Sequence, residues 1–398
     1  LIGEVWVLGG QSNMAFALGQ VLDAPAEINA ANYPNIRFFT VQPSNTAAPI
    51  FDWREEMPAP YGRWYSQSPA TAGSQSAVGY YFGRMLHKEL GVPVGLVNTS
   101  YGGATAQAYT PIEALEGDSR LKATFVDPYK ANPDMNVLVR PAELYNSMVH
   151  PLLPLSARGV VWYQGEGNWG DYPIYPLLMK TLINGWRRNF AHSEMPFYYV
   201  QIAPWGFGQD TSSKEWFYTQ GEAIGYAYMR EAQALTREQV SHSGMAVTMD
   251  VGDPDDIHPT NKRPVGERLA LLALNGTYGR SEVACLGPRY NSLKVENGVV
   301  KLLFDNAEGL KTNDGQAPKH FYVASTAGSE HKFWPASAEI HGSEVWLTCP
   351  DVVTTSTAAS GVAVRYAFLL YPMTNLENGA GLPAEPFRND SWSEEISY

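Results

Sequence analysis

The stretch Gly3–Met14, GEVWVLGGQSNM, is predicted to join a buried strand to the start of a helix. Its apolar run Glu4–Leu8 has the length of a strand and ends in two glycines, and the residues that follow can begin a helix. We expect Ser12 to lie at this strand-to-helix turn, with its backbone N–H at a helix N-terminus and its hydroxyl at the sheet edge. The alternative is an ordinary helix N-cap, a position that serine often occupies.

Similar apolar runs recur through the first 260 residues and predict further strands at Val92–Asn98, Gly159–Tyr163, Phe197–Ile202 and Met245–Met249. Segments with helical periodicity occur at Ala77–Leu90, Tyr175–Arg188, Glu222–Leu235 and Pro264–Leu274. Strands that alternate with helices predict βαβ units and a parallel sheet. Ligands of such sheets bind beyond the carboxyl ends of the strands, so the residues after each apolar run are the candidates for function.

After about Tyr278 the pattern changes to an alternation of apolar and polar residues with a period of two, which is typical of strands with one face exposed to solvent. It occurs at Val299–Phe304, His320–Ala324, Glu344–Leu347 and Val362–Leu370. The length of 398 residues is enough for two to three domains. We predict an α/β domain over residues 1–280, a small β-rich module over 281–372, and a largely irregular tail over 373–398 that packs back on the first domain. The two cysteines, Cys285 and Cys349, fit either a disulfide or two buried thiols.

Composition excludes several classes of protein. With 44% hydrophobic and 17% charged residues the chain is globular and not disordered. Its net charge of −12, without a run of basic residues, argues against a nucleic acid partner. The longest apolar stretches, near Leu269–Leu274 and Ala367–Tyr371, are shorter than the ~18–20 residues that cross a bilayer, so no membrane span is expected. We expect any signal peptide to lie outside this sequence, which starts at Leu1 in a strand-like segment.

Polar groups follow the second and third predicted strands. Gly102 and Gly103 come after Val92–Asn98, and adjacent glycines let backbone N–H groups approach an anion, although most such pairs are simply tight turns. The third strand is followed by an amide, a carboxylate and a second amide, which come from Gln164, Glu166 and Asn168 and lie among the aromatic residues Trp162, Tyr163 and Trp169. Such a density of polar groups beside aromatic residues is harder to explain by structure alone.

The fifth predicted strand is followed by a loop that ends in His258 and contains Asp253, Asp255 and Asp256. An acid three residues before a histidine can accept the ring Nδ1–H and leave Nε2 to act as a base. The same side chains could instead gather a hard divalent cation, but the loop lacks the regular ligand spacing of an EF-hand, and we predict no metal.

Together these strand ends supply a serine, two glycine N–H donors and an Asp-x-x-His pair, which are the parts of a serine hydrolase. The order Ser, Asp, His is that of the α/β-hydrolases, but those enzymes have Gly-x-Ser-x-Gly, whereas Met14 follows Ser12 by two residues here. A different family of serine hydrolases is therefore indicated.

The motifs resemble the SGNH hydrolase superfamily and, within it, the sialate O-acetylesterase group. The resemblance rests on GEVWVLGGQSNM (Gly3–Met14), GVVWYQGEGN (Gly159–Asn168), YVQIAP (Tyr199–Pro204) and DIHPTNKRPVGERLALLAL (Asp256–Leu274), and it continues to AVRYAF (Ala363–Phe368) and GLPAEPFRND (Gly381–Asp390). It implies a flavodoxin-like three-layer α/β/α fold with a parallel sheet, a C-terminal β-rich module, and serine carbohydrate esterase activity without a cofactor.

The resemblance also implies individual roles. Ser12 is the expected nucleophile, His258 the base and Asp255 the acid, and the oxyanion is held by the N–H groups of Ser12 and Gly103 and by the side chain of Gln164. Many members of the superfamily have Asn as that third donor, and Asn168, four residues after Gln164, is the alternative. Where the group usually has Gly-Glu-Ser-Asn, this chain has Gly167 in place of the serine. Related proteins often carry a β-domain before the first strand, which this sequence does not include.

The expected substrate is an O-acetylated sugar, most simply sialic acid, with acetylxylan or another acetylated hemicellulose as the alternative. Glu166, Asn168, Arg140 and Trp169 are candidate substrate contacts. Arg140 or Arg388 is the candidate partner for the sialic acid carboxylate, although each is better explained as a solvated residue or as part of a structural ion pair. A carbohydrate-binding module with a decayed hydrolase site is the alternative that is not an enzyme. The glycan substrates of the group imply a secreted or periplasmic, bacterial-type location.

Overall fold

The computed structural model describes residues 2–51, 61–207, 225–327 and 331–392. They fall into two compact units, each built from three segments of the chain. The first unit comprises Leu1–Ile202, Ala232–Ala246 and Thr260–Val283, and the second comprises Ala203–Glu231, Val247–Pro259 and Ala284–Tyr398. The predicted division at residue 280 stays a prediction.

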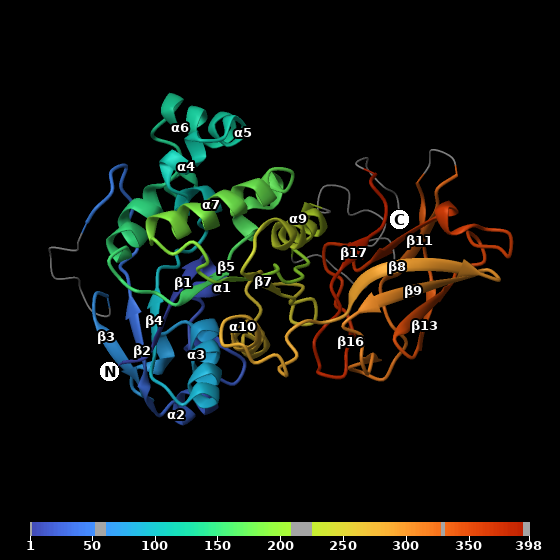
Figure 1. Cartoon of the computed structure of the whole chain (residues 1–398), viewed down its shortest axis with the longest axis horizontal. Helices are drawn as coiled ribbons and strands as arrows, with labels where there is room; N and C mark the ends of the chain where they lie inside the picture. The colour runs from blue at the N-terminus through green and yellow to red at the C-terminus, as the bar shows by residue number, and fades with distance from the viewer. Residues whose placement is uncertain (1, 52–60, 208–224, 328–330, 393–398) are drawn as a thin grey trace. The chain divides into compact units, whose positions relative to one another are not determined.

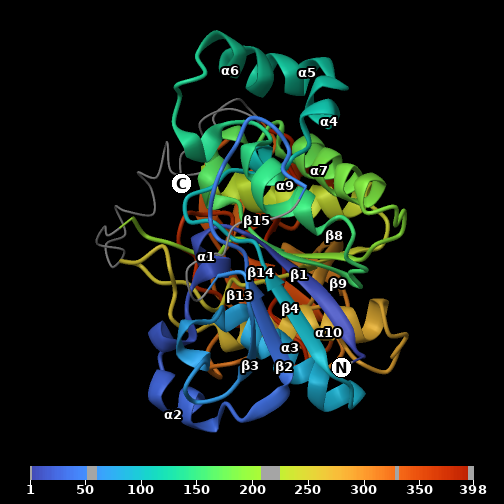
Figure 2. The same cartoon turned by 90° about the vertical axis from the view of Figure 1, so that its left-hand side faces the viewer.

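A seven-stranded sheet forms the centre of the first unit, in the order β3-β2-β4-β1-β5-β6-β7 (Figures 1 and 2). Its strands are β1 (Glu4–Gly10), β2 (Tyr33–Thr40), β3 (Trp64–Gln67), β4 (Val94–Asn98), β5 (Gly159–Tyr163), β6 (Phe197–Val200) and β7 (Ser243–Ala246). All neighbours pair in parallel except β2 and β3. The sub-order β4-β1-β5-β6-β7 is the 2-1-3-4-5 order of flavodoxin-like folds, which confirms the predicted fold class.

The topology makes β1 the switch point of the sheet, because the next strands along the chain, β2, β3 and β4, lie on one side of β1 and the later strands β5, β6 and β7 lie on the other. Leu8 on β1 pairs with Asn98 on β4 and with Val161 on β5. The carboxyl ends of these three strands therefore lie side by side, and in open α/β sheets the ligand crevice lies at such a point. Ser12 follows β1 directly at this edge.

Helices cover both faces of this sheet, as the three-layer fold predicts. Leu8 and Gly9 are successive residues of β1 and so point to opposite faces. The helix α3 (Ala77–Leu90) packs on the Leu8 face, since a Cβ built on Gly79 of α3 would lie 2.4 Å from the Leu8 side chain. The helix α7 (Tyr175–Asn189) packs on the Gly9 face, since a Cβ built on Gly9 would lie 3.5 Å from the Trp186 side chain of α7. Figure 1 shows α3 and α10 (Arg263–Gly276) on one side of the sheet and α7 on the other.

The predicted helices are confirmed with small changes at their ends. The helix α3 has the predicted bounds because Ser76 caps its N-terminus by accepting the Gly79 N–H, and Gly91, with φ 69°, ends it. The fourth predicted helix is α9 (Gly225–Gln239), and residues 222–224 of the prediction lie outside the described part of the chain. The helix expected after the first strand is α1 (Ser12–Ala15). Four further short helices were not predicted, namely α2 (Ala24–Ala30), α4 (Ile112–Glu116), α5 (Ser119–Leu121) and α6 (Asp127–Ala131).

Several features of the sheet differ from the prediction. The strand β4 begins at Val94 and not at Val92, and β6 ends at Val200 and not at Ile202. The strand predicted at Met245–Met249 is β7 and ends at Ala246, because its partner β6 ends at Val200, which pairs with Ala246. The strands β2 and β3 were missed because only a quarter of the residues in each are buried, so no continuous apolar run marks them. The strand β3 lies at the sheet edge, and β2 pairs between β3 and β4.

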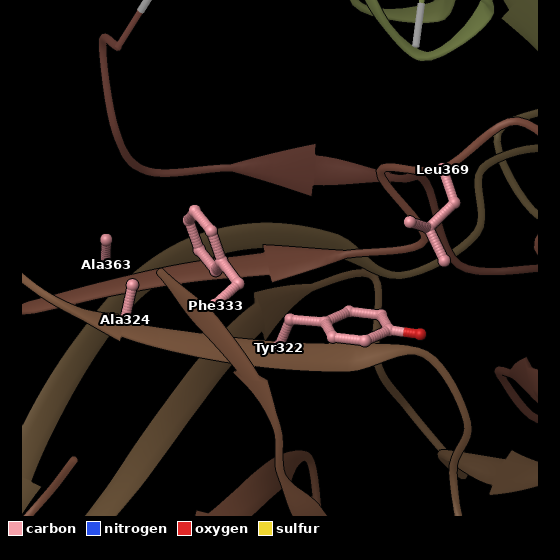
Figure 3. Packing of buried hydrophobic residues seen from close by; sticks show 5 residues of the cluster. All are labelled: Tyr322, Ala324, Phe333, Ala363 and Leu369. Carbon is pink, nitrogen blue, oxygen red and sulfur yellow. The ribbon is translucent and has the colours of Figure 1, made fainter. Parts of the chain in front are cut away.

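The second unit contains the β-rich region. One four-stranded antiparallel sheet has the order β13-β14-β9-β8 and another has the order β12-β11-β15-β17. Their strands are β8 (Arg289–Glu296), β9 (Val299–Asp305), β11 (Phe321–Ser325), β12 (Phe333–Pro335), β13 (Ser337–His341), β14 (Glu344–Thr348), β15 (Val362–Tyr366) and β17 (Phe387–Arg388). Figure 3 shows buried side chains on and beside the second sheet, from Tyr322, Ala324, Phe333, Ala363 and Leu369.

Several details of the second unit refine the prediction. The strand predicted to reach Leu370 ends at Tyr366 because Ala367 has φ 51°, a left-handed conformation that breaks the extended chain. The predicted tail contributes β16 (Leu376–Glu377), which pairs with β10 (Lys311–Thr312), as well as β17; residues 393–398 lie outside the described part. Cys285 and Cys349 are free thiols. Among the described residues, no helix is long and apolar enough to cross a membrane.

Candidate active site

Gly10 shapes the turn that presents Ser12. It has φ 128°, and a Cβ at this position would lie 2.1 Å from the carbonyl oxygen of Tyr163, so only glycine fits between β1 and β5. The Gln11 N–H donates to that same Tyr163 carbonyl at 2.9 Å, and the Met14 N–H donates back to the Gln11 carbonyl at 2.9 Å. The half-buried Ser12 therefore begins α1 directly after the strand, as predicted.

The glycine pair after β4 lies beside Ser12. A Cβ built on Gly102 would lie 3.9 Å from the Ser12 Cβ, and the Tyr101 N–H donates to the Gly10 carbonyl at 3.0 Å. Gly103 has φ 74°, the left-handed conformation that favours glycine. The structure therefore brings together two of the sequence-predicted groups, the Ser12 turn and the Gly102–Gly103 turn.

The end of β5 is a network of buried amides. Gln164 is fully buried, and its Nε2 donates to Asn168 Oδ1 at 2.8 Å and to the Ala104 carbonyl at 3.3 Å. Its Oε1 accepts the Tyr175 hydroxyl proton at 2.8 Å, and burial raises the pKa of Tyr175, which keeps that hydroxyl protonated. Both protons of the Gln164 amide thus have acceptors within the protein. For Gln164 to bind the oxyanion, its Nε2 has to give up one of these two hydrogen bonds and donate to the oxyanion instead.

Asn168 extends this network. Its Oδ1 accepts the Ala106 N–H at 2.8 Å as well as the Gln164 amide, and its Nδ2 donates to Gln107 Oε1 at 2.9 Å and to Asp171 Oδ2 at 2.8 Å. Burial raises the pKa of Asp171. With an exposed fraction of 1%, Asn168 links the loops after β4 and β5. This placement favours a supporting role for Asn168 over the substrate contact predicted from the sequence.

The loop that carries His258 is organised by carboxylates within the second unit. Asp253 Oδ1 accepts the N–H groups of Asp255 and Asp256 at 2.8 and 3.0 Å. Asp256 Oδ1 accepts the His258 N–H at 2.8 Å and lies 3.1 Å from the His258 ring Nδ1. The sequence spacing pointed to Asp255 as the acid, whereas the carboxylate in contact with Nδ1 in the structure belongs to its neighbour.

An aromatic segment is hydrogen-bonded to this loop. The Asp253 N–H donates to the Pro204 carbonyl at 3.1 Å, and the Gly206 N–H donates to the Pro254 carbonyl at 3.1 Å. Trp205 lies between these bonds and stacks on Phe207, with ring centroids 3.8 Å apart. Among the described residues, no group of three or more His, Cys, Asp or Glu side chains is arranged to hold a metal ion.

Comparison with known proteins identifies the family. Residues 2–275 match the family model described as carbohydrate esterase, sialic acid-specific acetylesterase. The chain belongs to this family. The matched region includes Ser12, Gly103, Gln164 and His258, and membership makes the protein a carboxylic ester hydrolase, as predicted.

Relatives of this acetylesterase match almost the whole chain. It is 29% identical to the sialate O-acetylesterase of Homo sapiens and 27% identical to that of Mus musculus, over 97% of this chain and 75% and 77% of the relatives. A solved structure, a carbohydrate acetylesterase from Xanthomonas citri, is 35% identical and superposes with a TM-score of 0.82, covering 98% of this chain and 82% of that one. The resemblance seen in the sequence is thereby confirmed.

In this acetylesterase both predicted arginines have partners within the protein. Arg140 Nε donates to the Met135 carbonyl at 2.8 Å, and its guanidinium lies 3.7 Å from Glu143. Arg388, in the second unit, makes a bidentate pair with Glu231 at 2.7 and 2.9 Å. These are the structural ion pairs that the sequence left open as the alternative.

The aromatic candidates divide by burial. Trp162 and Tyr163 have exposed fractions of 0%, and Trp162 packs edge-on against Tyr109 and Trp186 in the core. Trp169 is 38% exposed, on the helical turn after β5. Of the three, Trp169 has the most exposed side chain, and its contact with a sugar stays a prediction.

Proposed function

We propose that this acetylesterase removes O-acetyl groups from sialic acid, with Ser12 as nucleophile and His258 as general base. The observation that carries the proposal is the position of Ser12, which stands on a strand-to-helix turn at the switch point of the sheet and beside the Gly102–Gly103 turn. Family membership over residues 2–275 and the named activity of the relatives support the reaction class.

The proposed reaction has two steps. His258 removes the Ser12 proton as Oγ attacks the acetyl carbonyl, and the tetrahedral intermediate collapses as His258 protonates the departing sugar hydroxyl. Water, activated by His258, then cleaves the acetyl-serine and releases acetate. The contact at Nδ1 favours Asp256 as the residue that orients the imidazole, with Asp255 as the alternative implied by the family spacing. No step requires a cofactor.

The oxyanion is proposed to be bound by the backbone N–H groups of Ser12 and Gly103. Gln164 joins them if it exchanges its longer bond, the one of 3.3 Å to the Ala104 carbonyl. Removal of one such donor is expected to lower kcat by roughly 10²–10³-fold. The proposal also places the enzyme in a secreted or periplasmic setting, where acetylated glycans are found.

A second substrate class is favoured by one observation. Both arginines predicted to bind a sugar carboxylate are engaged in ion pairs within the protein. A neutral acetylated sugar, such as acetylated xylo-oligosaccharide, needs no such cation, and the similar structure from Xanthomonas citri is described only as a carbohydrate acetylesterase.

The test compares Ser12→Ala with Ser281→Ala, a matched change at an exposed serine. We expect Ser12→Ala to abolish release of acetate from an aryl acetate while the circular dichroism spectrum is unchanged, and Ser281→Ala to keep full activity. Near-native turnover by Ser12→Ala would overturn the nucleophile assignment. Comparing kcat/KM on O-acetylated sialic acid and on acetylated xylo-oligosaccharide then decides the substrate class.

A further inference from the structure

Asn13, the residue after Ser12, joins two buried charged side chains. Its Nδ2 donates to Glu166 Oε1 at 2.6 Å, and its Oδ1 accepts a hydrogen bond from Lys262 Nζ at 2.5 Å. The exposed fractions are 1% for Asn13, 6% for Glu166 and 1% for Lys262. All three belong to the first unit, and they come from the nucleophile turn, the loop after β5 and the residue before α10.

Lys262 is further enclosed by aromatic rings. Its Nζ lies 4.8 Å from the centre of the Phe16 ring and 5.5 Å from the centre of the Tyr163 ring, within the range of cation–π attraction. Phe16 follows α1 and Tyr163 ends β5. The ammonium group therefore contacts both sides of the turn that holds Ser12.

The chemistry of the network sets the orientation of the Asn13 side chain. A carboxamide has an oxygen that accepts and an NH₂ that donates, and here the oxygen faces a cation while the NH₂ faces an anion. Turning the amide over would place like partial charges against both neighbours. The two charges also compensate each other through the amide, since an ionised side chain is rarely buried without a partner. The arrangement thus has one favourable geometry.

Gln11 adds a second link on the other side of Ser12. Its Oε1 accepts the Gly167 N–H at 3.0 Å, so the side chains of Gln11 and Asn13 both reach the loop after β5. The two neighbours of Ser12 are therefore held by the same loop, and the direction of the Ser12 backbone N–H and Cβ between them follows from these bonds.

We propose that Lys262 and Glu166 are positioning residues for the nucleophile, acting through Asn13. The inference rests on the proposed role of Ser12, and it assigns to Glu166 a task different from the substrate contact predicted from the sequence. Attack on an ester requires the serine Oγ and its oxyanion donor in one geometry, and a displacement of about 1 Å can cost roughly 100-fold in rate. The pair maintains that geometry without touching the substrate.

The test is a double-mutant cycle of Lys262→Met, Glu166→Gln and the two combined, with Lys180→Met as the control at an exposed lysine. On an aryl acetate we expect each single variant to lower kcat by about 10- to 100-fold with KM within threefold of wild type. The double variant is expected to lose no more than the worse single variant, because no buried charge is then left without its counter-charge. Lys180→Met is expected to match wild type.

A purely structural role for the pair predicts a different result. In that case the melting temperature falls while kcat of the folded fraction stays within twofold of wild type. The folded fraction is titrated with an aryl phosphonate that labels the active serine. This outcome overturns the inference. If Lys262→Met does not fold, Glu166→Gln, which keeps the size and the acceptor oxygen, provides the same test. Activity that survives Ser12→Ala instead removes the proposed function itself, so the two failures are distinct.

Discussion

The Nδ1 atom of His258 lies 3.1 Å from Oδ1 of Asp256, and the same oxygen accepts the His258 backbone N–H at 2.8 Å. One carboxylate oxygen thus holds both the main chain and the ring of the proposed base. Such a contact fixes the tautomer that leaves Nε2 as the base and stabilises the imidazolium formed during attack.

This contact leads to the first prediction. Asp256→Asn removes the charge at Nδ1 and is expected to lower kcat on an aryl acetate by roughly 10- to 100-fold, whereas Asp255→Asn stays within about threefold. Steady-state kinetics of the two variants, made in parallel as each other's control, provide the measurement. A larger loss in Asp255→Asn would show that the family spacing, and not this contact, identifies the acid.

The second prediction concerns the nucleophile turn. Gly10→Ala places a Cβ 2.1 Å from the Tyr163 carbonyl at a position with φ 128°, so β1 and β5 must separate. We expect a loss of at least about 2 kcal/mol in the free energy of unfolding, together with loss of activity. Gly170→Ala is the control, since nothing lies within 4 Å of its added Cβ. Equal urea midpoints for the two variants would contradict the packing described here.

The third prediction is a pH dependence of stability in the second unit. Burial lowers the pKa of His320 to about 4, although its Nε2 lies 3.0 Å from the Met373 carbonyl. Between pH 6.5 and 4 the unfolded chain therefore binds a proton that the folded chain does not. The contribution of neutral His320 to the free energy of unfolding is complete above pH 6.5 and is lost as the pH falls toward 4. Between pH 7 and pH 5 the free energy of unfolding is expected to fall by at most about 2 kcal/mol from this source.

The variant for this prediction is His320→Asn, because His320 has φ 65° and asparagine tolerates that conformation. Urea unfolding at pH 7 and pH 5 is expected to show a smaller acid loss in His320→Asn than in wild type. His192→Asn, at an exposed histidine, is expected to behave as wild type. Equal acid losses in His320→Asn and wild type would rule out this source of the pH dependence.

Much of the first unit was predictable because its central strands are buried on both faces. Such strands read as apolar runs, and β5 was found with its observed bounds, Gly159–Tyr163. The helix α3 was equally clear, since its cap at Ser76 and its end at Gly91 are local signals. Ser12 could be placed at a strand-to-helix turn because the glycines and the serine directly follow the strand.

The sequence by itself therefore determined the strands and helices that carry local signals, the serine at a strand end and the family. Tertiary structure decided the rest. The strands β2 and β3 carry no apolar run, and the assembly of each unit from three separate segments follows from the path of the chain. The link between Asn13 and Lys262, which are 249 positions apart, exists only once the topology places them together. Local patterns report burial and turns, whereas such contacts depend on how distant segments pack.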